Sequence, residues 1–276
     1  INYMHGVASL KLSNNVIKKY EESFLKKIYF QPYKSLLKTY LKPSFDTPIY
    51  VANSEYTKNK IETILKIFNS RVIYPPVDTE IYEKILSSYN RKNQVITISR
   101  FTKEKNLELI PQIASLCPDD IKFEIITSSV GVKKDFLQEF TKKCKDYDVQ
   151  SRIKMSIDIS FEEKLEIIKK SKVYLHLMEE EHFGLSISEA CSSGCLPVVK
   201  NGGGQVEVVR GIPDSIYNSL EDAAQLIVNN VKSWTPTKAS SISKMMRKFD
   251  KKKFSTKMFE IISEVYAKKG KSSLTQ

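Results

Sequence analysis

Two glutamates, Glu181 and Glu189, lie eight positions apart in the segment Glu-His-Phe-Gly-Leu-Ser-Ile-Ser-Glu. An acidic loop precedes this segment, and small residues at 187–193 predict a helix. Because eight helical residues span about 12 Å, the two carboxylates cannot serve the same group. Free N–H groups and the helix dipole make a helix N-terminus a site for phosphate. The spacing therefore predicts a ligand with a central diphosphate and hydroxyl groups on both sides, as in a nucleotide-sugar.

Two glutamates at this spacing also occur on solvated helix faces. The surrounding sequence therefore has to distinguish a ligand site from a solvated surface pair. The apolar run 173–177 predicts a buried parallel strand that leads into the glutamate loop. After the helix come Gly194, a second apolar run at 196–199 and the glycines 202–204. This order is that of a βαβ unit, whose ligands bind at the carboxyl ends of the strands. The context favours a ligand site.

Arg100 and Lys105 follow another predicted strand, 94–99, and belong to the same edge of the predicted sheet. Arginine binds phosphate through a planar fork, and lysine binds it as a point charge. A basic loop on a basic protein is the alternative interpretation. The convergence of two cations and a helix N-terminus at one edge favours diphosphate binding.

Helical and strand patterns alternate along most of the chain, which predicts an α/β fold with a parallel sheet and right-handed crossovers. The predicted strands are 94–99, 122–127, 153–157, 173–177, 196–199 and 206–209, and helices are predicted at 106–116, 133–145, 161–170 and 187–193. A strand at 48–52 and a helix at 55–68 precede them. We expect an N-terminal domain (1–76), a linker (77–93), a C-terminal α/β domain that carries the ligand site (94–235), and a basic segment with a C-terminal helix (236–276) that could cross back to the first domain.

The 276 residues carry 44 Lys and Arg against 32 Asp and Glu, a net charge of +12. Most of the excess is lysine, concentrated at 18–42 and 238–257, and neither segment clearly shows the arginines with interleaved exposed aromatic residues that nucleic-acid binding favours. A solvated lysine face or peripheral contact with an anionic membrane explains it better. No apolar run approaches the ~20 residues of a membrane span. Four cysteines without metal spacing predict buried thiols in a reducing compartment, here the cytoplasm.

Four pieces of sequence occur in a characteristic order: Pro75-Pro76-Val77-Asp78; Ser99-Arg100-Phe101 with Lys105-Asn106; Glu181-His-Phe-Gly184-Leu185 with Glu189-Ala190; and Gly203-Gly204 with Glu207-Val208. With these pieces the chain resembles the retaining nucleotide-sugar glycosyltransferases of the B-type fold (GT-B), family four, over roughly residues 51–230. Glu-His-Phe-Gly and the segment Tyr3-x-His5 are similar to the mannosyltransferases that extend lipid-linked oligosaccharides. The resemblance implies a Rossmann-like donor-binding domain, with a partial second Rossmann-like domain at the N-terminus.

The resemblance also implies a role for each site residue. Glu181 and His5 would be catalytic, with Glu181 binding donor-sugar hydroxyls and shielding positive charge at the anomeric carbon. Arg100 and Lys105 would hold the diphosphate, and Glu189 would bind the ribose. Backbone N–H groups would add phosphate contacts at Phe183, Gly184 and Leu185. This chemistry depends on electrostatic stabilisation and needs no metal or other cofactor.

The implied function is transfer of a hexose, mannose as the best single choice, from a GDP- or UDP-linked donor to a lipid-linked or glycan acceptor. A non-catalytic nucleotide-sugar-binding or assembly subunit is the alternative, because only about 75 residues precede the linker and the glycine-rich acceptor loop of the family is missing. A nucleic-acid-binding protein is a third reading, supported by charge alone. Pro197 also lies one place later than in the family's usual Gly-x-Pro-Val-Val. This departure concerns the loop and leaves the fold expectation unchanged.

Overall fold

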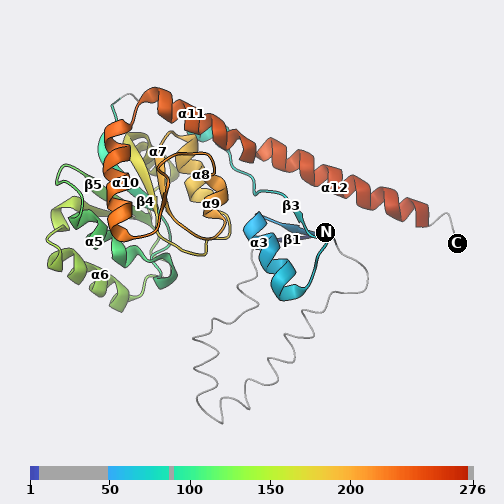
Figure 1. Ribbon diagram of the computed structural model, residues 1–276, viewed down its shortest axis with the longest axis horizontal. Helices are drawn as coiled ribbons and strands as arrows, with labels where there is room; N and C mark the ends of the chain where they lie inside the picture. The colour runs from blue at the N-terminus through green and yellow to red at the C-terminus, as the bar shows by residue number, and fades with distance from the viewer. Residues whose placement is uncertain (6–48, 87–89, 273–276) are drawn as a thin grey trace, which may run out of the picture. The chain divides into compact units, whose positions relative to one another are not determined.

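The computed structural model describes residues 1–5, 49–86 and 90–272 (Figure 1), so the lysine-rich segment 18–42 lies outside the described residues. The chain divides into two compact units, residues 1–74 with 256–276, and residues 75–255. The predicted linker 77–93 contains α4 (Thr79–Glu83), which belongs to the second unit. Within the described residues, no helix is long and apolar enough to cross a membrane.

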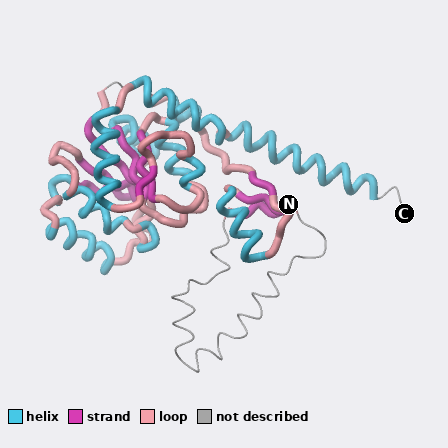
Figure 2. Tube along the Cα trace, in the orientation of Figure 1, coloured by secondary structure: helices cyan, strands magenta, loops and turns pink. Residues whose placement is uncertain are grey.

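The second unit is built around a parallel sheet, whose strands are magenta in Figure 2. Its six strands have the order β6-β5-β4-β7-β8-β9. Its strands are β4 (Lys92–Ile98), β5 (Lys122–Thr127), β6 (Ile153–Ile157), β7 (Ser171–His176), β8 (Leu196–Lys200) and β9 (Ile216–Tyr217). Val95 of β4 pairs in register with Phe123 on one side and Val173 on the other. The central pair β4 and β7 therefore brings the loops after these strands to one edge of the sheet. The α/β fold with a parallel Rossmann-like sheet is confirmed.

Helices cover both faces of this sheet (Figure 1). The chain runs outward from β4 to β6 through α5 (Ile110–Ser115) and α6 (Lys134–Asp146), then returns through α7 (Phe161–Lys170) and α8 (Leu185–Ser192). Right-handed crossovers in opposite directions place the first pair on one face and the second pair on the other. Helix α10 (Leu220–Ser233) packs beside α5. The main apolar core lies under α5, α6 and α10, where Phe101 packs against Phe136 and Phe140.

Local sequence explains where several helices begin. Ser160 and Glu163 form a capping box that begins α7, and the Ser219 hydroxyl caps α10. The predicted helix 106–116 is shorter: Asn106 adopts a left-handed conformation (φ 53°) between two 3-10 turns, and α5 begins only at Ile110. All four cysteines are buried and free, as predicted.

The predicted strand 206–209 is wrong. This segment is the short helix α9 (Gln205–Val208), and the last strand of the sheet is β9. The Gln205 side chain donates to the carbonyls of Met178, Glu179 and Lys200, which ties the segment to neighbouring loops. Because of these bonds the chain turns sharply after the glycines instead of extending.

The first unit contains a small parallel sheet of β1 (Asn2–Met4), β2 (Tyr50–Ala52) and β3 (Arg71–Val72). The Ser54 side chain caps helix α3 (Glu55–Lys60), which continues as a π-helix (Ile61–Leu65) and ends short of the predicted position 68. Helix α12 (Lys251–Ser272) starts in the second unit and enters the first. There Glu264 accepts two hydrogen bonds from Arg71, at 3.0 and 2.6 Å.

Candidate active site

The glutamate loop joins the end of β7 at His176 to the start of α8 at Leu185. Gly184 caps the helix with φ 108°, and a Cβ there would lie 2.6 Å from Ile187 Cδ1. Glycine is therefore required at this turn. As predicted, the loop, the helix N-terminus and both glutamates fall at the carboxyl edge of the sheet, where ligands of parallel α/β folds bind.

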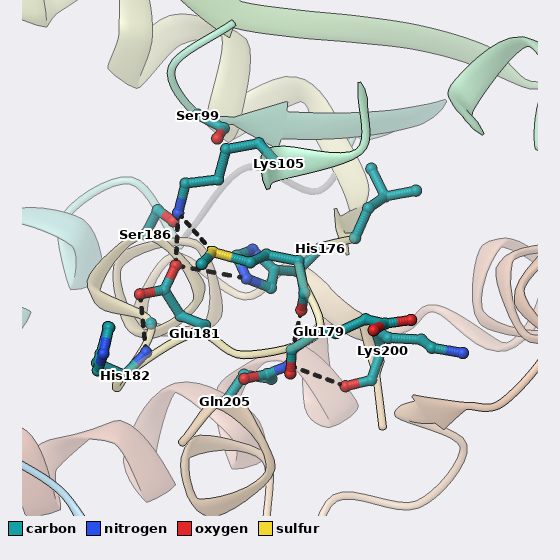
Figure 3. Close-up of polar contacts among 12 residues, drawn as sticks. Ser99, Lys105, His176, Glu179, Glu181, His182, Ser186, Lys200 and Gln205 are labelled. Carbon is teal, nitrogen blue, oxygen red and sulfur yellow. Dashed lines mark hydrogen bonds and ion pairs between the residues drawn. The ribbon is translucent and has the colours of Figure 1, made fainter. Parts of the chain in front are cut away.

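The carboxylate of Glu181 lies at the centre of a polar cluster drawn in Figure 3. Lys105 donates a hydrogen bond of 2.7 Å to Glu181 Oε2, and its ammonium also lies 3.1 Å from Met178 Sδ. The backbone N–H of His182 donates to Glu181 Oε1 at 3.1 Å. Burial alone would raise the pKa of Glu181, but the charge and hydrogen bond of Lys105 outweigh it and lower the pKa. Glu181 is therefore an ionised, mostly buried carboxylate.

Two loops have to meet for this contact to form. Lys105 ends the 3-10 turn after β4, and the side chain of the next residue, Asn106, donates to the carbonyl of Leu177 after β7 at 3.3 Å. The left-handed backbone of Asn106 lets the chain turn there. Adjacent parallel strands thus bring together a cation and a carboxylate that are 76 positions apart in the sequence.

His176 is a member of the cluster that the sequence analysis does not single out. The ring is almost fully buried, and its Nε2 lies 3.7 Å from Glu181 Oε2. Among the described residues, this Nε2 atom has no hydrogen-bond partner. Burial lowers the pKa of His176 to about 4; the charge of Glu181 opposes this shift, and the charge of Lys105 adds to it. The imidazole is therefore neutral at pH 7. One sequence signal could have identified His176: it is a polar residue at the carboxyl end of an otherwise apolar, buried strand.

The glycine loop supports Glu181 from the side of β8. The N–H of Gly204 donates to the Glu181 carbonyl at 2.6 Å. A Cβ on Gly203 would lie 2.6 Å from that same carbonyl oxygen, and one on Gly204 would collide with the His182 carbonyl oxygen. The two loops pack backbone to backbone, which only glycine permits. This packing gives the predicted Gly203-Gly204 pair a structural purpose.

The residues predicted to bind diphosphate differ in exposure. Lys105 is mostly buried beside Glu181, whereas Arg100 is 67% exposed and forms its ion pair with Glu104 at 3.9 Å. Phe183 is buried, with its ring 5.0 Å from that of Phe249, while Leu185 is exposed. The structure therefore brings Lys105, but not the side chain of Arg100, into contact with Glu181.

Glu189 lies in the second turn of α8, away from the Lys105 contact. Its Oε2 atom is 3.3 Å from the ammonium of Lys164 in α7. The Lys164 ammonium also donates to the hydroxyl of Tyr82 in α4 at 3.0 Å. Lys164 and Tyr82 are absent from the sequence-based site, because nothing in their local sequence distinguishes them.

His5 follows β1 in the first unit, the location the sequence analysis expects. Its carbonyl accepts a hydrogen bond from Asn53 Nδ2 at 3.0 Å, and its ring packs edge-on against Tyr3 with centroids 4.9 Å apart. The catalytic role of His5 stays a prediction.

The chain has the α/β fold of the GT-B glycosyltransferases, with parallel Rossmann-like sheets. Solved structures agree: HepE of Anabaena, in complex with UDP and glucose, superposes with a TM-score of 0.69 at 19% identity, covering 79% of this chain and 63% of HepE. Sucrose-phosphate synthase of Thermosynechococcus elongatus gives a TM-score of 0.74 at 14% identity, over 96% of this chain and 67% of that enzyme. At these identities the likeness concerns the fold.

Residues 78–211 match the family described as glycosyl transferases group 1. Among curated relatives, the GDP-Man:Man(3)GlcNAc(2)-PP-Dol alpha-1,2-mannosyltransferase of Dictyostelium discoideum is 25% identical over 198 residues, 65% of this chain and 39% of that protein. The human protein of the same name is 26% identical over 232 residues, 77% of this chain and 46% of that protein. The match to the group 1 glycosyltransferases covers residues 78–211, slightly less than half of the chain, and the chain spans less than half the length of these relatives.

Proposed function

We propose that the chain transfers a hexose from a nucleotide-sugar to a lipid-linked or glycan acceptor, with retention of configuration. The observation that carries the proposal is the pairing of Lys105 with Glu181 beside the N-terminus of α8. A cation suited to a diphosphate and a carboxylate suited to sugar hydroxyls are then adjacent. In the donor, the diphosphate and the sugar are adjacent in the same way. Mannose from GDP is the first substrate to test, because the relatives cited above are named as GDP-mannose enzymes. UDP-sugars come second, because HepE was solved with UDP and glucose.

In this proposal each part of the donor has a separate contact. The diphosphate lies between Lys105, Arg100 and the backbone N–H groups at the start of α8. The sugar lies against Glu181, and the ribose hydroxyls bind Glu189. The positive charge comes from protein side chains, so neither a metal nor another cofactor is part of the proposal.

The reaction breaks the bond between the anomeric carbon and the diphosphate oxygen. The electron pair of this bond leaves with the diphosphate. Lys105 stabilises that developing negative charge, and the ionised Glu181 stabilises the positive charge at the anomeric carbon. The acceptor hydroxyl attacks on the same face, forms the new glycosidic bond and gives its proton to a departing phosphate oxygen. His5 is proposed as the second catalytic residue, on the acceptor side.

We also propose a peripheral contact with an anionic membrane at the cytoplasmic face. Its support is the lysine excess at 238–257, although two of these lysines, Lys251 and Lys252, are already paired with Asp78 and Glu80 at 2.5 Å. Liposomes that contain anionic lipid should co-sediment the protein at low salt and release it at high salt. Absence from the pellet at low salt would contradict the contact.

The deciding experiment combines binding and transfer. Thermal shifts with GDP, UDP and their hexose conjugates should show a preferred nucleotide, and transfer or donor hydrolysis should be lost in Glu181→Ala. Nucleotide binding without any turnover would support the non-catalytic binding subunit instead. If none of the nucleotides raises the melting temperature and single-stranded nucleic acid does, the glycosyltransferase proposal is wrong.

A further inference from the structure

Glu189, the carboxylate proposed to bind ribose, pairs with Lys164, which in turn is bonded to Tyr82 from another helix. Lys164, in the first turn of α7, places its ammonium 3.3 Å from Glu189 Oε2 and 3.0 Å from the Tyr82 hydroxyl. Burial raises the pKa of Tyr82, in α4, and the nearby charge of Glu189 raises it further. Lys164 bridges the other two side chains, because its ammonium donates to the Glu189 carboxylate and to the Tyr82 hydroxyl.

The position of Lys164 is fixed by aromatic rings as well as by Glu189. Its ammonium lies 5.0 Å from the ring centroid of Phe161 and 5.5 Å from that of Tyr82, within the range of cation–π attraction. These two rings meet edge to face, with centroids 6.4 Å apart. The side chain of Lys164 is only 20% exposed. A lysine held in this way is a rigid element and not a mobile surface charge.

This arrangement suits a carboxylate that has to bind a diol. An ionised carboxylate offers about four lone-pair sites, and the bond from Lys164 leaves acceptors for two hydroxyl groups. A cation at Glu189 also offsets the repulsion between that carboxylate and a nearby diphosphate. Fixing the side chain before the ligand arrives reduces the entropy that binding would otherwise lose.

We propose that Lys164 and Tyr82 are positioning residues that hold the Glu189 carboxylate in place to accept the ribose 2′ and 3′ hydroxyls, and that Lys164 thereby sets the preference for ribonucleotides. The inference rests on the proposed donor site. It adds to that site two residues outside the motifs of the sequence and a specificity that follows from their geometry.

The test measures the affinities of GDP and 2′-deoxy-GDP by calorimetry, for the wild type and for Lys164→Met, with the UDP pair in parallel. Methionine keeps an apolar stem between the two rings. The wild type should prefer the ribonucleotide about tenfold, the equivalent of one hydrogen bond to a charged group. In Lys164→Met that ratio should fall toward one, because GDP loses affinity and 2′-deoxy-GDP hardly changes.

Two further variants make the result specific. Lys170→Met removes a lysine from the same helix that is 53% exposed and pairs with Glu166, so it should keep the wild-type ratio. Tyr82→Phe should lower the ratio partway, and it tests the same geometry if Lys164→Met does not fold. An equal loss of affinity for GDP and 2′-deoxy-GDP in Lys164→Met would overturn the inference, because Lys164 would then act on the phosphates. A wild-type ratio near one overturns it too, whereas a wild type that binds no nucleotide overturns the proposed function itself.

Discussion

The ammonium of Lys105 and the carboxylate of Glu181 are joined by a 2.7 Å hydrogen bond, and both side chains are at least four-fifths buried. The pair is therefore weakly screened by solvent and strongly coupled. It also sets the two proposed donor contacts in competition, because a diphosphate that binds Lys105 must share it with Glu181. Loss of the Glu181 charge should therefore raise nucleotide affinity, and loss of the Lys105 charge should lower it.

Replacement of Glu181 by glutamine should strengthen the binding of a nucleoside diphosphate that carries no sugar. The variant removes a negative charge beside the phosphates and leaves Lys105 to them, a gain of about fivefold for ~1 kcal/mol of repulsion removed. Sugar transfer should fall at the same time, because the anomeric carbon loses its stabilising charge. Calorimetric titration with GDP and UDP measures the first effect. Glu179→Gln, an exposed residue of the same loop, is the matched control and should leave affinity unchanged; weaker nucleotide binding in Glu181→Gln would contradict the competition.

His176 should make stability depend on pH. Its folded-state pKa of about 4 lies below the usual value near 6.5, so the unfolded chain takes up this proton first as the pH falls. The stability from the neutral ring is therefore complete above pH 6.5 and is lost progressively toward pH 4, by roughly 3 kcal/mol. His176→Phe keeps a ring that can stack on Tyr174 but does not titrate, so its free energy of unfolding should change less over this interval. Urea unfolding of both proteins between pH 7 and pH 4 provides the comparison, and parallel curves would refute the assignment.

Gly204→Ala should disturb the site without changing any polar side chain. The new methyl group would meet the backbone of His182 and Phe183, and overpacking of this kind costs about 1–3 kcal/mol. The loop that carries Glu181 has to move, so nucleotide affinity should fall together with the melting temperature. Gly131→Ala is the control: its φ of 85° makes alanine strained there, so stability should fall, but the new methyl group would approach no atom closer than 3.9 Å. Equal nucleotide affinities in the two variants would show that the close loop packing has no role in the site.

Sequence patterns predict the elements of this fold better than its contacts. Short continuous apolar runs, separated by helical patterns, are sufficient to place β4 to β8, because parallel strands buried on both faces consist of such runs. The same patterns do not show that Lys105 meets Glu181, since that contact depends on β4 and β7 being neighbours in the sheet. Tyr82 and Lys164 were not predicted for a similar reason: they reach Glu189 from two helices, and neither belongs to a local motif. The error at 206–209 arises because the side chain of Gln205 bonds three carbonyls of neighbouring loops, which no periodicity reveals.

The two cations proposed to bind the diphosphate, Lys105 and Arg100, should contribute unequally to nucleotide affinity. Their contributions should also differ in how strongly they depend on salt concentration. Lys105 has a 15% exposed side chain, whereas that of Arg100 is 67% exposed and paired with Glu104. Lys105→Met should reduce affinity for GDP or UDP by roughly tenfold to a hundredfold, the range expected when a buried charge-assisted hydrogen bond to phosphate is lost. Arg100→Ala should cost less at low salt, and almost nothing at 1 M salt, where the Debye length is about 3 Å. Titrations of both variants at low and high salt measure this difference.

If Arg100→Ala has no effect even at low salt, Arg100 is not a phosphate ligand and the diphosphate is held by Lys105 and the start of α8. If Lys105→Met binds as tightly as the wild type, the proposed diphosphate position is wrong.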